Sequence, residues 1–229
     1  MKNILYDKIS DRKIELISKQ VSAIKDYSLY DDICNIFNQI SEKSLYDIPL
    51  MLEWNIWRAM TMLDGGGIRA NLKFDDFGKP MSTAQGNIAD IICDYDNFGL
   101  AVEVTMQTGH RQYEMEGEPV ARHLAKLKKE SGKPAYCLFI APSINEACIA
   151  HFYMLHKVPI SYYGGVSIIV PLPLNVFIKM VEDSYNARYI PEPKHIQRFF
   201  EYSILIADIS KDEKEWYDKI KSRALNWLA

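Results

Sequence analysis

Acidic residues embedded in two apolar stretches constrain this chain more than any other feature. Ile88–Cys93 and Leu100–Met106 are separated by a turn-like sequence rich in Asp, Asn and Gly, which predicts a β-hairpin. Because side chains alternate faces along a strand, Glu103 and Thr105 share one face of the second strand. A carboxylate within an apolar strand is costly unless a cation or hydrogen bonds compensate for it.

Asp90 supplies a second carboxylate from the first strand of the same hairpin. It lies with Ile88 and Ile92 on one face of that strand, so carboxylates project from two adjacent strands. Hard oxygen ligands that converge in this way suit Mg²⁺. The hairpin alone leaves open the alternative that both carboxylates lie on edge strands and face solvent.

A helix is predicted from His110 to about Lys129, ended by Ser131-Gly132 and Pro134. Gly117 and Pro119 weaken the helical pattern and indicate a break or kink near Gly117. One face should lie on the sheet, and its members recur at helical spacing: Tyr113, Glu116, Val120, Leu124 and Leu127.

Glu116 is the acidic residue of that sheet-facing side, so a third carboxylate approaches Asp90 and Glu103. Glu114 and Glu118 fall on another face, which predicts a solvated surface shared with basic residues. His123 also lies on the sheet-facing side, where we expect a hydrogen-bonded core or rim histidine and not a ligand.

A fourth carboxylate lies on an apolar helix predicted over Ile48–Leu63. Glu53 is the only charged residue on the face that also carries Leu50, Trp57 and Met60. The helix alone does not separate a functional Glu53 from a buried glutamate that bonds to backbone or reaches the rim.

The carboxylates and their neighbours resemble a known nuclease pattern. Asp90, followed thirteen residues later by Glu103-Val104-Thr105, matches the core motif of PD-(D/E)XK nucleases. The wider run, from about Leu50 to Leu127, is similar to the cleavage domains of AlwI-type restriction endonucleases, which include nicking enzymes and the small subunits of heterodimeric Type IIS enzymes. The matching elements are Leu52-Glu53-Trp54, Glu103-Val104-Thr105, Gly109-His110-Arg111-Gln112, Glu116 and Val120-Ala121-Arg122-His123.

This resemblance implies an α/β, restriction-endonuclease-like fold. Its PD-(D/E)XK core would be a central mixed sheet flanked by helices, with extra helices toward both ends of the chain. The implied activity is that of a Mg²⁺-dependent Type II (IIS-like) site-specific deoxyribonuclease cleavage subunit, with Mn²⁺ as a substitute metal. A length of 229 residues suits one domain, so residues 1–229 are expected to form a single nuclease domain.

The site residues follow from the same resemblance. Asp90 and Glu103 would hold Mg²⁺, and the backbone carbonyl of Val104 would add a ligand, as in related nucleases. Glu116 and Glu53 would bind a second ion or position the attacking water.

Thr105 stands where the wider superfamily has a lysine, and it supplies no positive charge. The AlwI-type group shares this threonine, so the departure does not argue against activity. Glu116 or a second ion would then orient the attacking water. Charge would come from Arg111, Lys126 or Lys128, and their spacing favours none of the three.

The charge balance indicates that DNA recognition and DNA cleavage are carried out by different chains. The chain has 27 Lys and Arg against 30 Asp and Glu, whereas phosphate binding usually requires a basic surface. We therefore expect recognition of double-stranded DNA to need a larger DNA-recognition subunit in a heterodimer, or a second copy. Two other functions stay open: a catalytically idle assembly subunit with a nuclease fold, and a nuclease acting on RNA or branched DNA.

Composition predicts a cytoplasmic protein without a membrane span, and the resemblance to restriction enzymes implies a prokaryotic one. No 18-residue apolar run is present, and the first residues lack a signal-peptide core. The four cysteines have no metal-ligand spacing and are expected to be reduced and buried.

The remaining sequence predicts an α/β frame without repeats. A loop is expected over Asp75–Gly86, either as a plain connector or in contact with substrate. Trp216 and Trp227 are expected either in the core or on a docking surface. Strands are predicted at Asn71–Phe74, Pro134–Ile140 and Val166–Pro171. Further helices are predicted at Asp11–Ala23, Asp31–Ile40, Asn145–His156, Leu174–Ser184, Lys194–Ile206 and Asp212–Leu228.

Overall fold

A mixed five-stranded sheet forms the centre of the computed structural model, which describes residues 2–64, 66–83 and 86–229. The strand order is β1-β4-β5-β6-β7. Strand β4 is antiparallel to its two neighbours, β1 and β5, whereas β5, β6 and β7 run parallel to one another. The strands are β1 (Ile68–Ala70), β4 (Ile91–Asp94), β5 (Gly99–Val104), β6 (Ala135–Ala141) and β7 (Ile169–Pro173).

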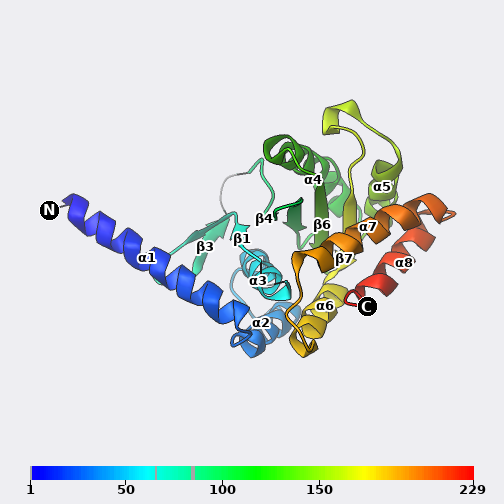
Figure 1. The fold of residues 1–229 in the computed structure, drawn as a ribbon. Coiled ribbons are helices and arrows are strands. Elements are labelled where there is room, and N and C mark those ends of the chain that lie inside the picture. Colours follow the sequence, from blue (N-terminus) through cyan, green and yellow to red (C-terminus); the bar gives the residue numbers. More distant parts are fainter. Residues whose placement is uncertain (1, 65, 84–85) are drawn as a thin grey trace.

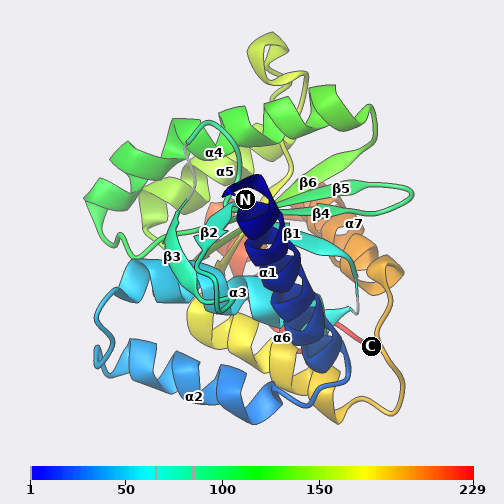
Figure 2. The same cartoon turned by 90° about the vertical axis from the view of Figure 1, so that its left-hand side faces the viewer.

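Helices cover both faces of this sheet, so the expected α/β arrangement is confirmed (Figure 2). Helices α4 (His110–Ser131) and α5 (Glu146–Lys157) form the parallel crossovers and cover one face. Helices α3 (Ile48–Leu63) and α6 (Leu174–Asn186) cover the other, and α2 (Tyr30–Ser41) packs outside α3.

The ends of the chain add helices to this core, as expected. Helix α1 (Lys2–Lys25) contacts α3 near its C-terminal end and extends away from the body toward the N-terminus (Figure 1). Helices α7 (Pro193–Ile209) and α8 (Glu213–Ala224) pack against α5 and each other, and a 3₁₀ turn, η1 (Ser161–Tyr163), precedes β7. No helix in the described ranges is long and apolar enough to cross a membrane.

Local sequence signals fix the ends of the helices that frame the site. Asp47 caps α3 by accepting a hydrogen bond from the Leu50 N–H at 3.1 Å, and a proline follows in the first turn. Helix α4 ends at Gly132, whose φ of +63° is the left-handed conformation that glycine adopts without strain. Each of these two helices thus has one end fixed by its own local sequence.

Strand β5 lies in the middle of the core, and every one of its residues is buried. It pairs with β4 on one side and β6 on the other, so its apolar side chains pack against helices on both faces. Trp216 and Trp227 are also core residues, with their indole N–H groups donating to the carbonyls of Ser203 and Met180. A docking role for these two tryptophans is therefore wrong.

A second, two-stranded sheet precedes the hairpin. Strand β2 (Leu72–Phe74) confirms the strand expected at Asn71–Phe74, and it pairs with β3 (Pro80–Thr83). The expected connector is therefore right at residues 75–79, which form a turn, and wrong at Pro80–Thr83. The turn is local: the Asp75 carboxylate accepts from two backbone N–H groups at 2.8 Å, and Gly78 has a φ of +76°. Ala84 and Gln85 of the same expected connector lie outside the described residues.

Three other expectations differ from the structure. Helix α4 runs unbroken through Gly117 and Pro119, because its packing against β5, β6 and α5 outweighs their low helix propensity. Tyr113 is 37% exposed at the edge of α4, where its ring meets His151 of α5 instead of the sheet. Helix α8 ends at Ala224, four residues before the expected end.

The pairing limits of the hairpin also differ slightly from those expected. Strand β4 begins at Ile91, so Asp90 lies just outside it, and β5 ends at Val104. The two strands pair antiparallel with Ile91 opposite Val102, which confirms the hairpin itself.

Candidate active site

A cavity of about 300 Å³ opens between α3, β5 and α4. The structure brings together the four acidic side chains that the sequence singled out, and Thr105 lines the same cavity: the four are Glu53, Asp90, Glu103 and Glu116. Glu114 and Glu118 lie outside it with side chains that are 61% and 51% exposed, as the helical spacing predicted. Residues from a helix, a turn, a strand and a second helix thus converge on one volume.

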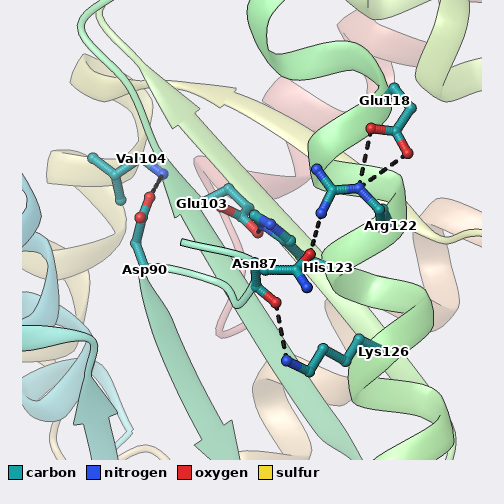
Figure 3. Close-up of polar contacts among 8 residues, drawn as sticks. All are labelled: Asn87, Asp90, Glu103, Val104, Glu118, Arg122, His123 and Lys126. Atoms are coloured by element: carbon teal, nitrogen blue, oxygen red, sulfur yellow. Dashed lines mark hydrogen bonds and ion pairs between the residues drawn. The ribbon is translucent and has the colours of Figure 1, made fainter. Parts of the chain in front are cut away.

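Asp90 is held at the entrance to β4 by two backbone contacts. Its carboxylate accepts a hydrogen bond from the Val104 N–H at 2.8 Å (Figure 3). Its carbonyl accepts from the Asn71 N–H at 2.7 Å. At the end of β5, the Asp90 carboxylate thereby accepts the hydrogen bond that a backbone carbonyl of a paired strand would otherwise accept. Burial is the main cause that raises the pKa of Asp90, and repulsion from Glu103 adds to it.

Glu103 projects from the fully paired strand β5 and is 6% exposed. Its Oε1 atom lies 2.8 Å from Nδ1 of His123 on α4 (Figure 3). Burial raises the pKa of Glu103 well above the ordinary range, and the charge of Glu116 raises it further.

His123 is the member of the cavity that we did not predict as a functional residue. Burial lowers the pKa of His123, which favours the neutral ring at pH 7. The expected hydrogen-bonded rim histidine is what the structure shows, but its partner is Glu103. The sequence signal available for His123 was its position seven residues after Glu116, two turns further along the same helix face.

Glu53 and Glu116 face the same cavity from opposite helices. The Oε2 atom of Glu53 is shielded from solvent and has no hydrogen-bond partner among the described residues. Burial raises the pKa of Glu53, and repulsion from Asp90 is the next cause. Burial also raises the pKa of Glu116, although the nearby Thr105 hydroxyl opposes the rise. The alternative of a Glu53 bonded to backbone therefore finds no support at Oε2.

Within the described residues, no three His, Cys, Asp or Glu side chains are drawn close enough to form a ready metal-ligand cluster. Two of the carboxylates already have protein partners: Asp90 accepts from the Val104 N–H, and Glu103 lies in hydrogen-bond contact with the His123 ring. The donor set nevertheless fits a hard divalent cation. It consists of carboxylate oxygens that repel one another and include one buried oxygen without a partner.

The described lining of this cavity includes no Lys or Arg. Lys126 reaches the carbonyl of Asn87, and Lys128 reaches that of Val166 at 2.5 Å. Arg111 is exposed near the start of α4. None of the three cations considered from the sequence therefore replaces the motif lysine inside the cavity.

Gln112 explains how the chain enters α4 beside the site. Its side chain is fully buried, donates to the carbonyls of Gln107 and Ser143 at 2.8 and 2.9 Å, and accepts from the Asn145 N–H. These bonds join the loop after β5 to the loop after β6, which fixes the first turn of α4 and hence the position of Glu116.

A mixed sheet between helix layers, with carboxylates grouped at the end of its central hairpin, defines a restriction-endonuclease-like protein. The AlwI restriction endonuclease family matches residues 7–180. The chain belongs to this family. Its role is accordingly in a restriction system of the Type II class.

One solved structure shows the same fold. The chain is similar to the small subunit (R.BspD6I2) of the heterodimeric restriction endonuclease R.BspD6I, with 24% sequence identity and a TM-score of 0.66. The similarity covers 85% of this chain and 95% of that one. A comparison with curated proteins found no match.

Proposed function

We propose that this chain is the metal-dependent cleavage subunit of a Type IIS restriction endonuclease, with a PD-(D/E)XK active site in a single nuclease domain. Its substrate is double-stranded DNA in a prokaryotic cytoplasm, and its reaction is hydrolysis of a phosphodiester bond. The observation that carries the proposal is the convergence of Glu53, Asp90, Glu103 and Glu116 on one cavity. An idle assembly subunit has no need to retain four mutually repelling carboxylates.

The residues divide the work as follows. Asp90, Glu103 and the Val104 carbonyl would hold Mg²⁺, or Mn²⁺ in its place. When bound, the ion polarises the scissile phosphate and lowers the pKa of water. The Val104 N–H keeps the Asp90 carboxylate aimed at the cavity, and His123 holds that of Glu103.

Glu116 and Glu53 complete the proposed site from the two flanking helices. Glu116 lies beside Thr105 and would orient the attacking water, since Thr105 lacks the charge of the usual lysine. Glu53, with its unpaired Oε2, would bind a second ion or help to position that water.

We further propose that sequence recognition comes from a partner, either a larger recognition subunit or a second copy. The net charge is −3, and the described lining of the acidic cavity holds no Lys or Arg to bind phosphate. The solved relative is itself the small subunit of a heterodimer, which supports the same division of labour.

The proposal is tested by plasmid nicking with the purified chain at high concentration in Mg²⁺ or Mn²⁺. Wild-type protein should nick supercoiled DNA slowly and without sequence preference. Asp90→Ala and Glu103→Ala should lose at least about a hundredfold in rate, because each removes a ligand for the phosphate-activating ion. Circular dichroism should show that both variants stay folded.

Glu114→Ala is the matched control, because Glu114 is an exposed carboxylate on the same helix as Glu116. It should nick at the wild-type rate. Nicking by Asp90→Ala at that rate would contradict the proposed site. Absence of nicking by the wild-type chain with either ion, alone and with its partner, would favour the idle assembly subunit. Faster cutting of labelled RNA than of DNA would change the substrate class.

A further inference from the structure

Two cations on one face of α4 hold the turn that leads to Asp90. Nη1 of Arg122 donates to the Oδ1 atom of Asn87, and Nζ of Lys126 donates to the Asn87 carbonyl at 3.1 Å (Figure 3). Arg122 is itself oriented by Glu118, whose two carboxylate oxygens lie 3.1 and 3.2 Å from Nε. Both the side chain and the backbone of Asn87 are therefore bound by the helix.

Asn87 lies three residues before Asp90, in a short segment whose buried residue is Ala89. Its φ is +75°, a left-handed conformation that asparagine tolerates better than most residues, and residues 86–90 belong to neither a helix nor a strand. The described backbone bonds of this segment occur at Asp90, three residues further on. The contacts from α4 thus restrain the upstream end of a short turn whose downstream end carries the carboxylate.

Neighbouring residues of α4 reach the two strands of the hairpin separately. His123 contacts Glu103 on β5, and Arg122 contacts the turn that precedes Asp90 and β4. The same helix therefore restrains both carboxylates, in addition to the Val104 and Asn71 bonds that hold Asp90 directly. A metal site needs its ligands held closely in place, and the residues that hold ligands affect metal affinity strongly.

We infer that Arg122, through Asn87, is a positioning residue for the proposed metal site, which it serves by fixing Asp90 opposite Glu103. This inference rests on the proposed function. Arg122 does not line the acidic cavity, and its side chain is 34% exposed. Because ion pairs this close to solvent contribute little to folding stability, its effect belongs in metal binding and not in the melting temperature.

The test is Mn²⁺ binding measured by titration calorimetry on the full chain. Arg122→Gln removes the guanidinium and shortens the side chain, and Asn87→Gly removes the side-chain acceptor while glycine still adopts the φ of +75°. Both variants should bind Mn²⁺ about tenfold or more weakly, while their melting temperatures change by less than about 4 °C. In nicking assays the Mn²⁺ concentration for half-maximal rate should rise more than the rate at saturating Mn²⁺ falls.

Lys133→Gln is the matched control. Lys133 has a 33% exposed side chain and also ties a distant turn to the sheet, through Asp94 and the Tyr95 carbonyl. That turn is the opposite end of the hairpin from Asp90, so this variant should bind Mn²⁺ like the wild type.

Including Asp90→Ala separates the inference from the function on which it rests. Mn²⁺ binding by the wild type that Asp90→Ala abolishes, together with unchanged binding by Arg122→Gln and Asn87→Gly, would overturn the positioning role alone. Weaker binding by Arg122→Gln but not by Asn87→Gly would overturn the route through Asn87. No Mn²⁺ binding by the wild type, or equal binding by Asp90→Ala, would overturn the proposed site and the inference together.

Discussion

Replacing Glu53 with methionine should stabilise the metal-free protein and at the same time abolish its cleavage activity. The buried Oε2 atom of Glu53 has no partner in the described structure, and its neighbours Pro49, Leu52 and Met106 in the cavity wall are apolar. A buried polar group without a partner costs about 1–3 kcal/mol. Because the rest of the Glu53 side chain is only half-buried, we expect the free energy of unfolding to rise by about 1–2 kcal/mol, the lower part of that range.

For a chain of this length, that gain corresponds to a rise of roughly 2–8 °C in melting temperature. The assay is differential scanning calorimetry in a metal chelator at about pH 8, where repulsion from Asp90 also acts on Glu53. Glu114→Met is the control: because the Glu114 carboxylate is exposed, its loss should change the free energy of unfolding by no more than about 0.5 kcal/mol. A lower melting temperature for Glu53→Met would refute the reasoning, because it would show that Glu53 makes a stabilising contact.

Three further outcomes follow from the structure. Burial raises the pKa values of Asp90 and Glu103. The contribution of these two groups to folding stability is therefore complete below about pH 4 and is lost as pH rises through the raised pKa values. Thermal melting in chelator should show this loss of stability, and millimolar Mg²⁺ should restore the stability. The isolated chain should bind DNA with a Kd weaker than about 1 µM at about 150 mM salt, and a tight, sequence-selective gel shift would locate the recognition element in this chain. A thiol reagent should modify the half-buried Cys34 first, while Cys93 and Cys137, buried and with raised pKa values, should react only on unfolding.

Much of the candidate site was predictable because it rests on local periodicity. The alternation around Glu103 identified a buried strand, and helical spacing placed Glu116 towards the sheet while Glu114 faced solvent. The apolar helix that carries Glu53 was predicted with the bounds that the structure has. Each of these features depends on residues within a few turns or one strand of each other.

The parts that sequence did not reveal depend on contacts between distant segments. His123 lies twenty residues from Glu103 along the chain, and helical spacing gave its direction but not its partner. Asn87 is bound by Arg122 and Lys126, which lie 35 and 39 positions further along the chain, and no periodic pattern encodes such contacts. Strand β3 was missed because it is short, begins with a proline and is mostly exposed, so its pairing with β2 is what identifies it.

The most direct test of the proposed site is anomalous diffraction from a crystal of this chain soaked with Mn²⁺. We expect a peak in the cavity between the carboxylates of Asp90 and Glu103, with Glu116 and Glu53 turned towards it. The same soak of an Asp90→Ala crystal should give no peak there. A wild-type crystal with no Mn²⁺ in this cavity, or with Mn²⁺ bound only at surface carboxylates such as Glu114, would contradict the assignment of a metal-dependent nuclease site.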